Sequence, residues 1–467
     1  MKIKVLNRNA EECTREGSQD LQRVFRNPDP SLHQFERARE YTRALNAVKI
    51  DRMFAKPFLH AMDQHKDGVF CMAKNQKKLN VLASGACDGE LRVWRLSDRE
   101  NIFHAPGAHK GFVRGLAFTS DGERLLSCGD DKTIKLWKPF KSAKGGDRDD
   151  GDDDDEEDGA DERKEAVATF AGQRGFTAID HSWEREPIFA TAGQSVDIWN
   201  ANRSMPTHSF NWGVDTIYSV RWNPAQTNIV ASTAADRSIG LYDVRLQSPV
   251  RKLVLQMVSN ALAWNPMEPF NFTTANEDHN LYTFDMRKLD SAMCVHMDHV
   301  GPVLDIDYSP TGQEFVAGSY DRTLRIFKRA GLTGSGHSRE VYHTSRMQRI
   351  FCVKFSMDSK FVLSGSDDTN VRLWKSNASE TLGVLLPREK KAQQYAAKLK
   401  ERYGHLQEVR RIEKHRHVPK VIKKTNEKKR IISNSLTRRE DNKRKHSTPG
   451  AVPYKPARKK KIVTVVE

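Results

Sequence analysis

The feature that most constrains the fold of this chain is an internal repeat whose units end in an aromatic residue. Short runs rich in β-branched residues end at seven such positions: Trp94, Trp137, Trp199, Tyr242, Phe284, Phe327 and Trp374. Their spacings are 43, 62, 43, 42, 43 and 47 residues. All except Trp199 follow an aspartate six residues earlier, at Asp88, Asp131, Asp236, Asp278, Asp321 and Asp368. Each unit indicates a strand, a tight turn and a second strand, and such units must stack to bury a core.

A period of about 40–45 residues with this ending is typical of WD40 repeats, which supply four strands to each blade of a propeller. The histidine found upstream in such repeats appears at His65, His109 and His299. Seven units can close a ring, which removes exposed sheet edges. We therefore expect an all-β fold, a seven-bladed WD40 β-propeller over residues 61–376. By analogy with this repeat family, the segment around Ala55–Leu59 completes the last blade.

Serine, histidine, aspartate and tryptophan recur at fixed offsets within the repeats. A hydrolase is one interpretation, but a catalytic triad occurs once per site, whereas a motif copied from blade to blade is a structural hydrogen-bond network. We assign this structural role to His65, Ser84, Asp88, Trp94, His109, Ser127, Asp131, Trp137, Ser232, Asp236, Asp321, Ser364, Asp368 and Trp374. The six cysteines are scattered, without metal-ligand spacing, and are expected to be reduced. The sequence predicts no catalytic residue, no metal, no cofactor and no small-molecule substrate.

Charge is distributed in blocks along the chain. The formal net charge is +16, yet residues 388–467 alone hold 26 Lys or Arg and 8 Asp or Glu, so the basicity belongs to the C-terminal tail. The run 145–165 holds 13 acidic residues and falls in the one long spacing, between Trp137 and Trp199. We expect a disordered acidic loop there, either simply solvated or a docking site for a basic protein. No apolar run approaches the roughly 20 residues that span a bilayer, so no membrane is expected among the partners.

Residues 377–467 are expected to form a basic tail that is largely helical or disordered. Helix formers and spaced apolar residues predict a long amphipathic helix from Pro387 to about His417, broken near Gly404 and stopped by Pro419. Basic clusters follow, and they suit nuclear localisation or contact with RNA phosphates without base-specific readout. These clusters are Lys423, Lys424, Lys428, Lys429, Arg430, Lys443, Arg444, Lys445, Arg458, Lys459, Lys460 and Lys461.

A helical N-terminal extension is expected over residues 1–60. Ser31 can cap a helix there, with an acid at Glu36 in its first turns. Apolar residues then fall on one helical face: Phe35, Ala38, Tyr41, Leu45 and Val48. That face either packs on the propeller or docks a partner, and we favour the partner because a closed ring needs no extra core.

Several segments resemble one family, the suppressor-of-fibrillarin-like WD-repeat proteins. They are Arg26–Leu32, Arg43–Lys49, Gly318–Thr323, Ser364–Trp374 and Leu382–Glu389, and the resemblance covers the chain apart from the acidic insert. It implies a nucleolar, non-catalytic scaffold of the small-subunit processome, monomeric within a large ribonucleoprotein and without a cofactor. The partners it implies are other processome proteins and the U3 small nucleolar RNA or pre-ribosomal RNA, which is cleaved toward 18S rRNA.

A second function comes from a different resemblance. The segments ending at Arg245 and Arg287 resemble the WDxR boxes of substrate receptors for cullin-4 RING ubiquitin ligases, and the family is also described as cullin-4 ligase associated factors. Arg245 and Arg287 would face the ligase adaptor, with Asp243 and Asp285 orienting them. Both boxes have Tyr or Phe where Trp is usual. Such arginines can also serve only to hold adjacent blades together.

Overall fold

The computed structural model describes residues 34–140, 165–183, 187–212, 215–246, 248–329, 336–448 and 450–466. The expected cap Ser31 and nearly all of the expected acidic loop, up to residue 164, lie outside these ranges. The chain divides into two compact units. The propeller unit comprises Phe58–Ser376 and His417–Glu467, and the helical unit comprises Met1–Pro57 and Asn377–Arg416. The C-terminal segment expected as one domain over 377–467 is thus divided between the two units.

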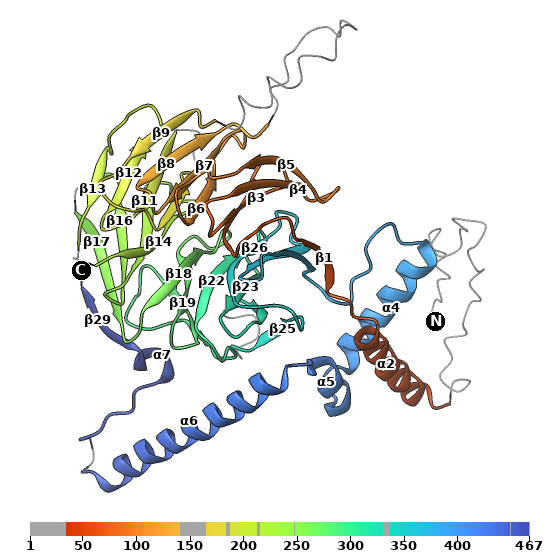
Figure 1. The fold of residues 1–467 in the computed structure, drawn as a ribbon. Helices are drawn as coiled ribbons and strands as arrows, with labels where there is room; N and C mark the ends of the chain where they lie inside the picture. The colour runs from red at the N-terminus through yellow and green to blue at the C-terminus, as the bar shows by residue number, and fades with distance from the viewer. Residues whose placement is uncertain are drawn as a thin grey trace, which may run out of the picture. The chain divides into compact units, whose positions relative to one another are not determined.

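In the described part of the propeller unit, seven antiparallel sheets form the blades of a ring (Figure 1). Blade one consists of β2 Val69–Lys74, β3 Val81–Ala86, β4 Leu91–Arg95 and β5 Glu100–Ala105. Blade two consists of β6 Val113–Phe118, β7 Leu125–Gly129, β8 Thr133–Trp137 and β9 Ala168–Ala171. Blade three consists of β10 Ala178–His181, β11 Ile188–Ala192, β12 Val196–Asn200 and β13 His208–Phe210. Blade four consists of β14 Ile217–Trp222, β15 Ile229–Ala234, β16 Ser238–Asp243 and β17 Pro249–Leu255. Blade five consists of β18 Ser259–Trp264, β19 Asn271–Asn276, β20 Leu281–Asp285 and β21 Cys294–His296. Blade six consists of β22 Val303–Tyr308, β23 Glu314–Ser319, β24 Leu324–Lys328 and β25 Ser338–Tyr342. Blade seven consists of β26 Ile350–Phe355, β27 Phe361–Ser366, β28 Val371–Lys375 and β1 Phe58–Met62. The expected seven-bladed propeller is confirmed.

The ring is closed by a strand from the N-terminal side of the propeller. β1 pairs antiparallel with β28, and the register sets Phe58 opposite Trp374 and Met62 opposite Val371. The Phe58 ring meets Trp374 edge-on, with centroids 5.4 Å apart. The expected completion of the last blade is therefore found, with the strand beginning at Phe58. Because β1 lies in blade seven and the chain continues from it into blade one, separating these two blades requires breaking a sheet.

The tight turns predicted from the aspartate spacing join the two middle strands in all blades except blade three. Lys132 (φ 63°) in blade two and Arg237 (φ 65°) in blade four both lie in the left-handed region, directly after the aspartate. Asp131 accepts a hydrogen bond from the Thr133 backbone N–H at 3.1 Å. This carboxylate supports a backbone conformation that costs a non-glycine residue free energy.

The core lies between adjacent blades. One buried cluster joins Leu91 and Val93 of blade one to Val113 and Leu116 of blade two. Gly85 belongs to the same contact, since a Cβ there would come within 2.7 Å of Val113 Cγ1. Side chains from two sheets thus interdigitate, which explains why each repeat needs its neighbours to bury its apolar face.

Three further elements belong to the propeller unit: α6 Lys420–His446, α7 Ala457–Lys460 and β29 Ile462–Val466. The helix expected to stop at Pro419 ends at Lys414, and Pro419 immediately precedes a separate 27-residue helix, α6. A proline is well suited to a helix start, where its missing N–H leaves no unmet hydrogen bond. β29 pairs with β17 and makes blade four five-stranded.

The helical unit contains α2 Glu36–Met53, α4 Pro387–Tyr403 and α5 Gln407–Lys414. The break between α4 and α5 lies at residues 404–406, as expected. Tyr41 donates to Glu408 at 2.6 Å and Tyr403 donates to Glu40 at 2.8 Å, so α2 packs against α4 and α5. The predicted face of α2 is only partly buried: Val48 is buried, but Phe35 and Ala38 are exposed. Among the helices described, none is long and apolar enough to cross a membrane.

Candidate functional site

The repeated polar residues form their full network in blade two. Trp137 Nε1 donates to Ser127 Oγ at 2.9 Å, and Ser127 Oγ lies 2.7 Å from His109 Nε2. His109 Nδ1 lies 3.0 Å from Asp131 Oδ1. The pattern fits a neutral imidazole that donates from Nδ1 and accepts the Ser127 hydroxyl proton at Nε2. Burial lowers the pKa of His109, and the hydrogen bond and charge of Asp131 only partly oppose this effect. The lowered pKa favours the neutral ring near pH 7.

Blade one uses a different carboxylate from the one predicted. His65 Nε2 lies 2.6 Å from Ser84 Oγ, and Trp94 Nε1 donates to Ser84 at 2.7 Å. His65 Nδ1, however, meets Glu90 Oε2 at 3.2 Å, while Asp88 only accepts the backbone N–H of Glu90 at 3.0 Å. Glu90 is longer than an aspartate by one methylene, so it reaches the imidazole from two residues further along the turn. Asp88 therefore shapes the turn and does not contact the histidine.

The remaining blades carry parts of the network. Ser232 donates to the Tyr242 hydroxyl at 3.1 Å, and Trp374 Nε1 donates to Ser364 at 2.9 Å. Asp321 Oδ2 lies 3.2 Å from His299 Nδ1. Of the other predicted aspartates, Asp236 accepts from the Ser238 backbone N–H, and Asp368 pairs with Arg372. Each set remains within its own repeat, so these residues do not converge on one reaction centre.

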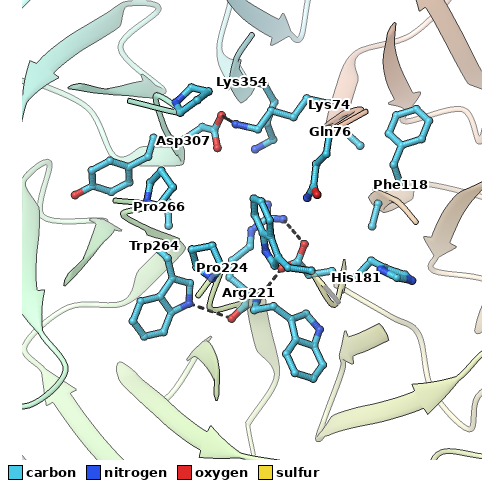
Figure 2. Close-up of a pocket in the computed structure, with 18 of the residues that line it drawn as sticks. Lys74, Gln76, Phe118, His181, Arg221, Pro224, Trp264, Pro266, Asp307 and Lys354 are labelled. Atoms are coloured by element: carbon cyan, nitrogen blue, oxygen red, sulfur yellow. Dashed lines mark hydrogen bonds and ion pairs between the residues drawn. The ribbon is translucent and has the colours of Figure 1, made fainter. Parts of the chain in front are cut away.

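The central channel holds a cavity of about 340 Å³ lined by residues of the innermost strands and the turns that follow them (Figure 2). Lys74 pairs with Asp307 at 2.6 Å, and Arg221 approaches Asp180 at 3.5 Å. The same carboxylates accept backbone N–H groups of the next blade, from Phe355 to Asp307 and from Trp222 to Asp180, both at 2.8 Å. Each carboxylate thus joins its blade to the next one, and the Lys74–Asp307 pair also links blades one and six. No group of three His, Cys, Asp or Glu suited to a metal ion occurs within the described residues.

The cysteines give no sign of a nucleophile in the part of the chain described. Five are free thiols: Cys71, Cys87, Cys128, Cys294 and Cys352. Cys87 is half-buried, and burial together with nearby carboxylates raises the pKa of its thiol to about 11. A thiol with so high a pKa carries almost no thiolate near pH 7, and the thiolate is the reactive form.

The structure brings Arg245 and Arg287 to equivalent loops of adjacent blades. They follow β16 and β20, each the third strand of its blade, so both arginines lie at the same end of the propeller. Each is held by the carboxylate two residues earlier, Arg245 to Asp243 at 2.9 Å and Arg287 to Asp285 at 3.0 Å. Their side chains are nevertheless 70% and 63% exposed. The hydrogen bond from Arg245 lowers the pKa of Asp243.

Another arginine makes a polar contact between blades four and five. Arg251 of β17 donates to the backbone oxygens of Met286 at 3.3 Å and Arg287 at 3.0 Å. The Arg287 guanidinium lies over the Phe270 ring at 4.3 Å, within its own blade. Arg245 and Arg287 are therefore oriented by their own blades and keep an accessible face, which favours binding over a purely inter-blade role.

The basic clusters of the tail fall into two groups. Most of their side chains are exposed, on α6 at Lys423, Lys424, Lys428, Arg430, Lys443 and Lys445 and beyond it at Arg458 and Lys459. The others are engaged: Lys429 donates to the Val300 backbone oxygen at 2.7 Å, Arg444 pairs with Asp441 at 2.8 Å, Lys460 pairs with Glu440 at 2.5 Å, and Lys461 is half-buried. Burial lowers the pKa of Lys429. The structure thus gathers the exposed bases on one long helix and the segment that follows it.

Sequence reasoning overlooked two features of the tail. Ile422 of α6 is buried, and the β-branched run Ile462–Val466 forms β29. The second feature had a signal, because four of its five residues are Ile or Val and a fifth is Thr, all strand formers. The run directly follows the basic cluster Arg458–Lys461, and the segment was therefore interpreted by its charge.

Comparisons with known proteins agree with this architecture. Residues 376–462 match the Sof1-like domain, and residues 56–95, 101–138, 292–328 and 335–375 match the WD domain, G-beta repeat. The chain is 51% identical to DDB1- and CUL4-associated factor 13 of Xenopus laevis and 50% identical to that of Homo sapiens, each over the whole of both chains. It is 47% identical to Protein SOF1 of Saccharomyces cerevisiae, covering 100% of this chain and 95% of that protein. A solved structure, the WD40 beta propeller domain of Doa1, matches with a TM-score of 0.54 at 17% identity over 68% of this chain and 96% of that chain, which supports the fold alone.

Proposed function

Because the chain belongs to the family of Sof1-like WD40-repeat proteins, we propose that it is a non-catalytic scaffold of the small-subunit processome. In this role it acts in the nucleolus, in U3 small nucleolar RNA-dependent processing of pre-ribosomal RNA toward 18S rRNA. The yeast relative named Protein SOF1 supports this assignment, since the similarity extends over nearly the full length of both proteins. The repeated, separated polar networks support a binding platform over an enzyme.

The observation that carries the proposal is the basic helix attached to a closed ring. α6 contains 11 Lys or Arg and three Asp or Glu, and its described side chains from residue 430 to residue 440 are all exposed. Its 27 residues span roughly 40 Å at about 1.5 Å per residue. A cationic surface of this length neutralises phosphates without reading bases, and its binding weakens steeply with salt.

Crosslinking of the full chain to RNA tests the proposal. The test variant replaces Lys423, Lys424, Lys443 and Lys445 with Gln, which removes four exposed charges from α6. The matched control replaces Lys66, Lys77, Lys110 and Lys132, four exposed lysines of the propeller, with Gln. We expect the test variant to crosslink less and to reduce the slope of log affinity against log salt by about 0.7–0.9 for each phosphate that is no longer neutralised. Equal losses in both variants, or none in either, would contradict the assignment of RNA contact to the tail.

A second candidate function is that of a receptor for a cullin-4 RING ubiquitin ligase. The relatives named DDB1- and CUL4-associated factor 13 favour it, as do the exposed and oriented guanidinium groups of Arg245 and Arg287. Guanidinium groups held at one edge retain donors on the other, which suits recognition of a partner's carboxylates or backbone oxygens.

Replacing Arg245 and Arg287 with Ala tests the receptor function. We expect adaptor co-purification to fall while the fold is kept, because both side chains lie outside the core. The matched control replaces Arg237 and Arg322 with Ala, exposed arginines in turns at the other end of the propeller. Lost pre-rRNA cleavage with intact adaptor binding would count against the receptor function and leave the scaffold function standing.

A further inference from the structure

The C-terminal strand β29 occupies the outer edge of blade four. Lys252 lies opposite Val466, Leu253 opposite Val465 and Val254 opposite Thr464. Among the described sheets, this is the only blade with a fifth strand. An outermost strand otherwise presents unpaired N–H and C=O groups, so β29 satisfies backbone groups that an exposed edge would leave open.

β29 is also bound through its side chains and the residues before it. Ile462 and Val465 pack against the apolar cluster shared by blades four and five, whereas Val463 and Val466 are 56% and 45% exposed. Gln256 donates from its backbone N–H to the Lys461 oxygen at 3.0 Å. Its side chain donates to the Lys460 oxygen at 2.9 Å.

The start of the tail is attached to the propeller at a separate place. Ile422 is buried, and Lys429 donates to the Val300 backbone oxygen at 2.7 Å. The rings of His417 and His343 lie 5.4 Å apart between centroids. Val300 and His343 belong to the loops that follow blades five and six, so this attachment does not involve the edge that β29 occupies.

Between the two attachments, the returning chain lies against α6. Arg444 lies over the Tyr454 ring at 4.9 Å, and Lys460 pairs with Glu440 at 2.5 Å. Further along, the Ala292 N–H donates to the Arg458 backbone oxygen at 3.1 Å. Residues 417–448 and 450–466 therefore form a strap that leaves the ring as α6 and comes back to the ring through α7 and β29.

We propose that the edge of β17 is a docking site for the chain's own residues 462–466, and that this docking makes the strap a pre-organised RNA-binding surface rather than a free basic arm. A helix fixed at both ends loses less conformational freedom on binding than a tail tethered at one end. The RNA part of this inference rests on the proposed function. The docking of the strand does not.

The charge of the last six residues distinguishes a docked strap from a tail that binds RNA through its charge alone. Residues 462–467 are Ile-Val-Thr-Val-Val-Glu, with one acid and no base. If the tail acted only through its charge, removing them would leave RNA affinity unchanged or slightly increased. If the strap acts as a clasped surface, the same truncation lowers affinity by about tenfold or more at constant salt.

The experiment compares the full chain with three variants. The first ends at Lys461, the second carries Ile462→Ser and Val465→Ser, and the third carries Val463→Ser and Val466→Ser. The second and third make the same chemical change on the inward and outward sides of β29, so the third is the matched control and also reports on folding. Hydrogen exchange of β17 amides measures docking, and RNA titration at fixed salt measures binding.

We expect the first two variants to speed exchange in β17 and weaken RNA binding, and the third to resemble the full chain. Unchanged exchange after truncation would overturn the docking, and faster exchange with unchanged RNA affinity would overturn the role of the strap in binding. A full chain that binds no RNA would refute the proposed function, and the exchange data would then decide the docking by themselves.

Discussion

Replacing Ser127 with alanine should strongly destabilise the propeller, and the structure sets the magnitude. Ser127 is fully buried and serves two buried partners, Trp137 Nε1 at 2.9 Å and His109 Nε2 at 2.7 Å. The substitution leaves both without that hydrogen bond, and an unmet buried polar group costs about 1–3 kcal/mol. We expect a loss of about 2–5 kcal/mol in the free energy of unfolding.

Ser364→Ala is the matched comparison, because Ser364 is equally buried and accepts from Trp374 Nε1 at 2.9 Å. One stranded donor predicts a loss of about 1–3 kcal/mol, so Ser127→Ala should cost more than Ser364→Ala. Urea titration followed by tryptophan fluorescence and far-UV circular dichroism gives both values, provided that the two probes coincide. Equal losses, or a Ser127→Ala variant as stable as the parent, would refute the network as a source of stability.

Two further predictions concern acid and ring closure. Burial lowers the pKa of His296 to about 4, so the folded protein holds this ring in its neutral form. The unfolded chain takes up a proton on His296 below about pH 6.5, so the free energy of unfolding falls progressively between about pH 6.5 and 4, by about 3 kcal/mol in all. Thermal unfolding between pH 7.5 and 4.5 should show this loss, and His296→Gln should flatten the profile; an unchanged slope would refute the assignment. Phe58→Ala removes the edge-on contact with Trp374 and should cost about 1–2 kcal/mol, with faster hydrogen exchange in β28. Exchange that rises equally in all blades would contradict a local role in closure.

The network in blade two was predictable, whereas that in blade one was not. In blade two, the spacing of His109, Ser127, Asp131 and Trp137 matches the contacts, because a strand and a tight turn fix the distance between positions along the chain. In blade one, Asp88 and Glu90 both lie in the turn, and only side-chain reach decides which carboxylate meets His65. Spacing cannot distinguish two acids that are two residues apart.

The tail shows the same limit on a larger scale. Its charge could be counted from the sequence, but the attachment of Lys429 and the pairing of Lys460 with Glu440 depend on residues far away in the chain or on a chain reversal. The contacts of the candidate arginines Arg245 and Arg287 could be predicted only in part. The pairing of Arg245 with Asp243 is local and was expected, whereas the bond from Arg251 to the backbone of Arg287 crosses between blades.

The sequence by itself determined the repeat, the number of blades, the turns and the concentration of positive charge, since each depends on periodicity or composition within a few tens of residues. Only the tertiary structure decided that Phe58 closes the ring against Trp374, that Glu90 replaces Asp88 and that Ile462–Val466 returns to β17. The reason is physical. Strand pairing uses backbone groups that every residue carries, so the choice of partner is set by which edge is open and near in the folded chain.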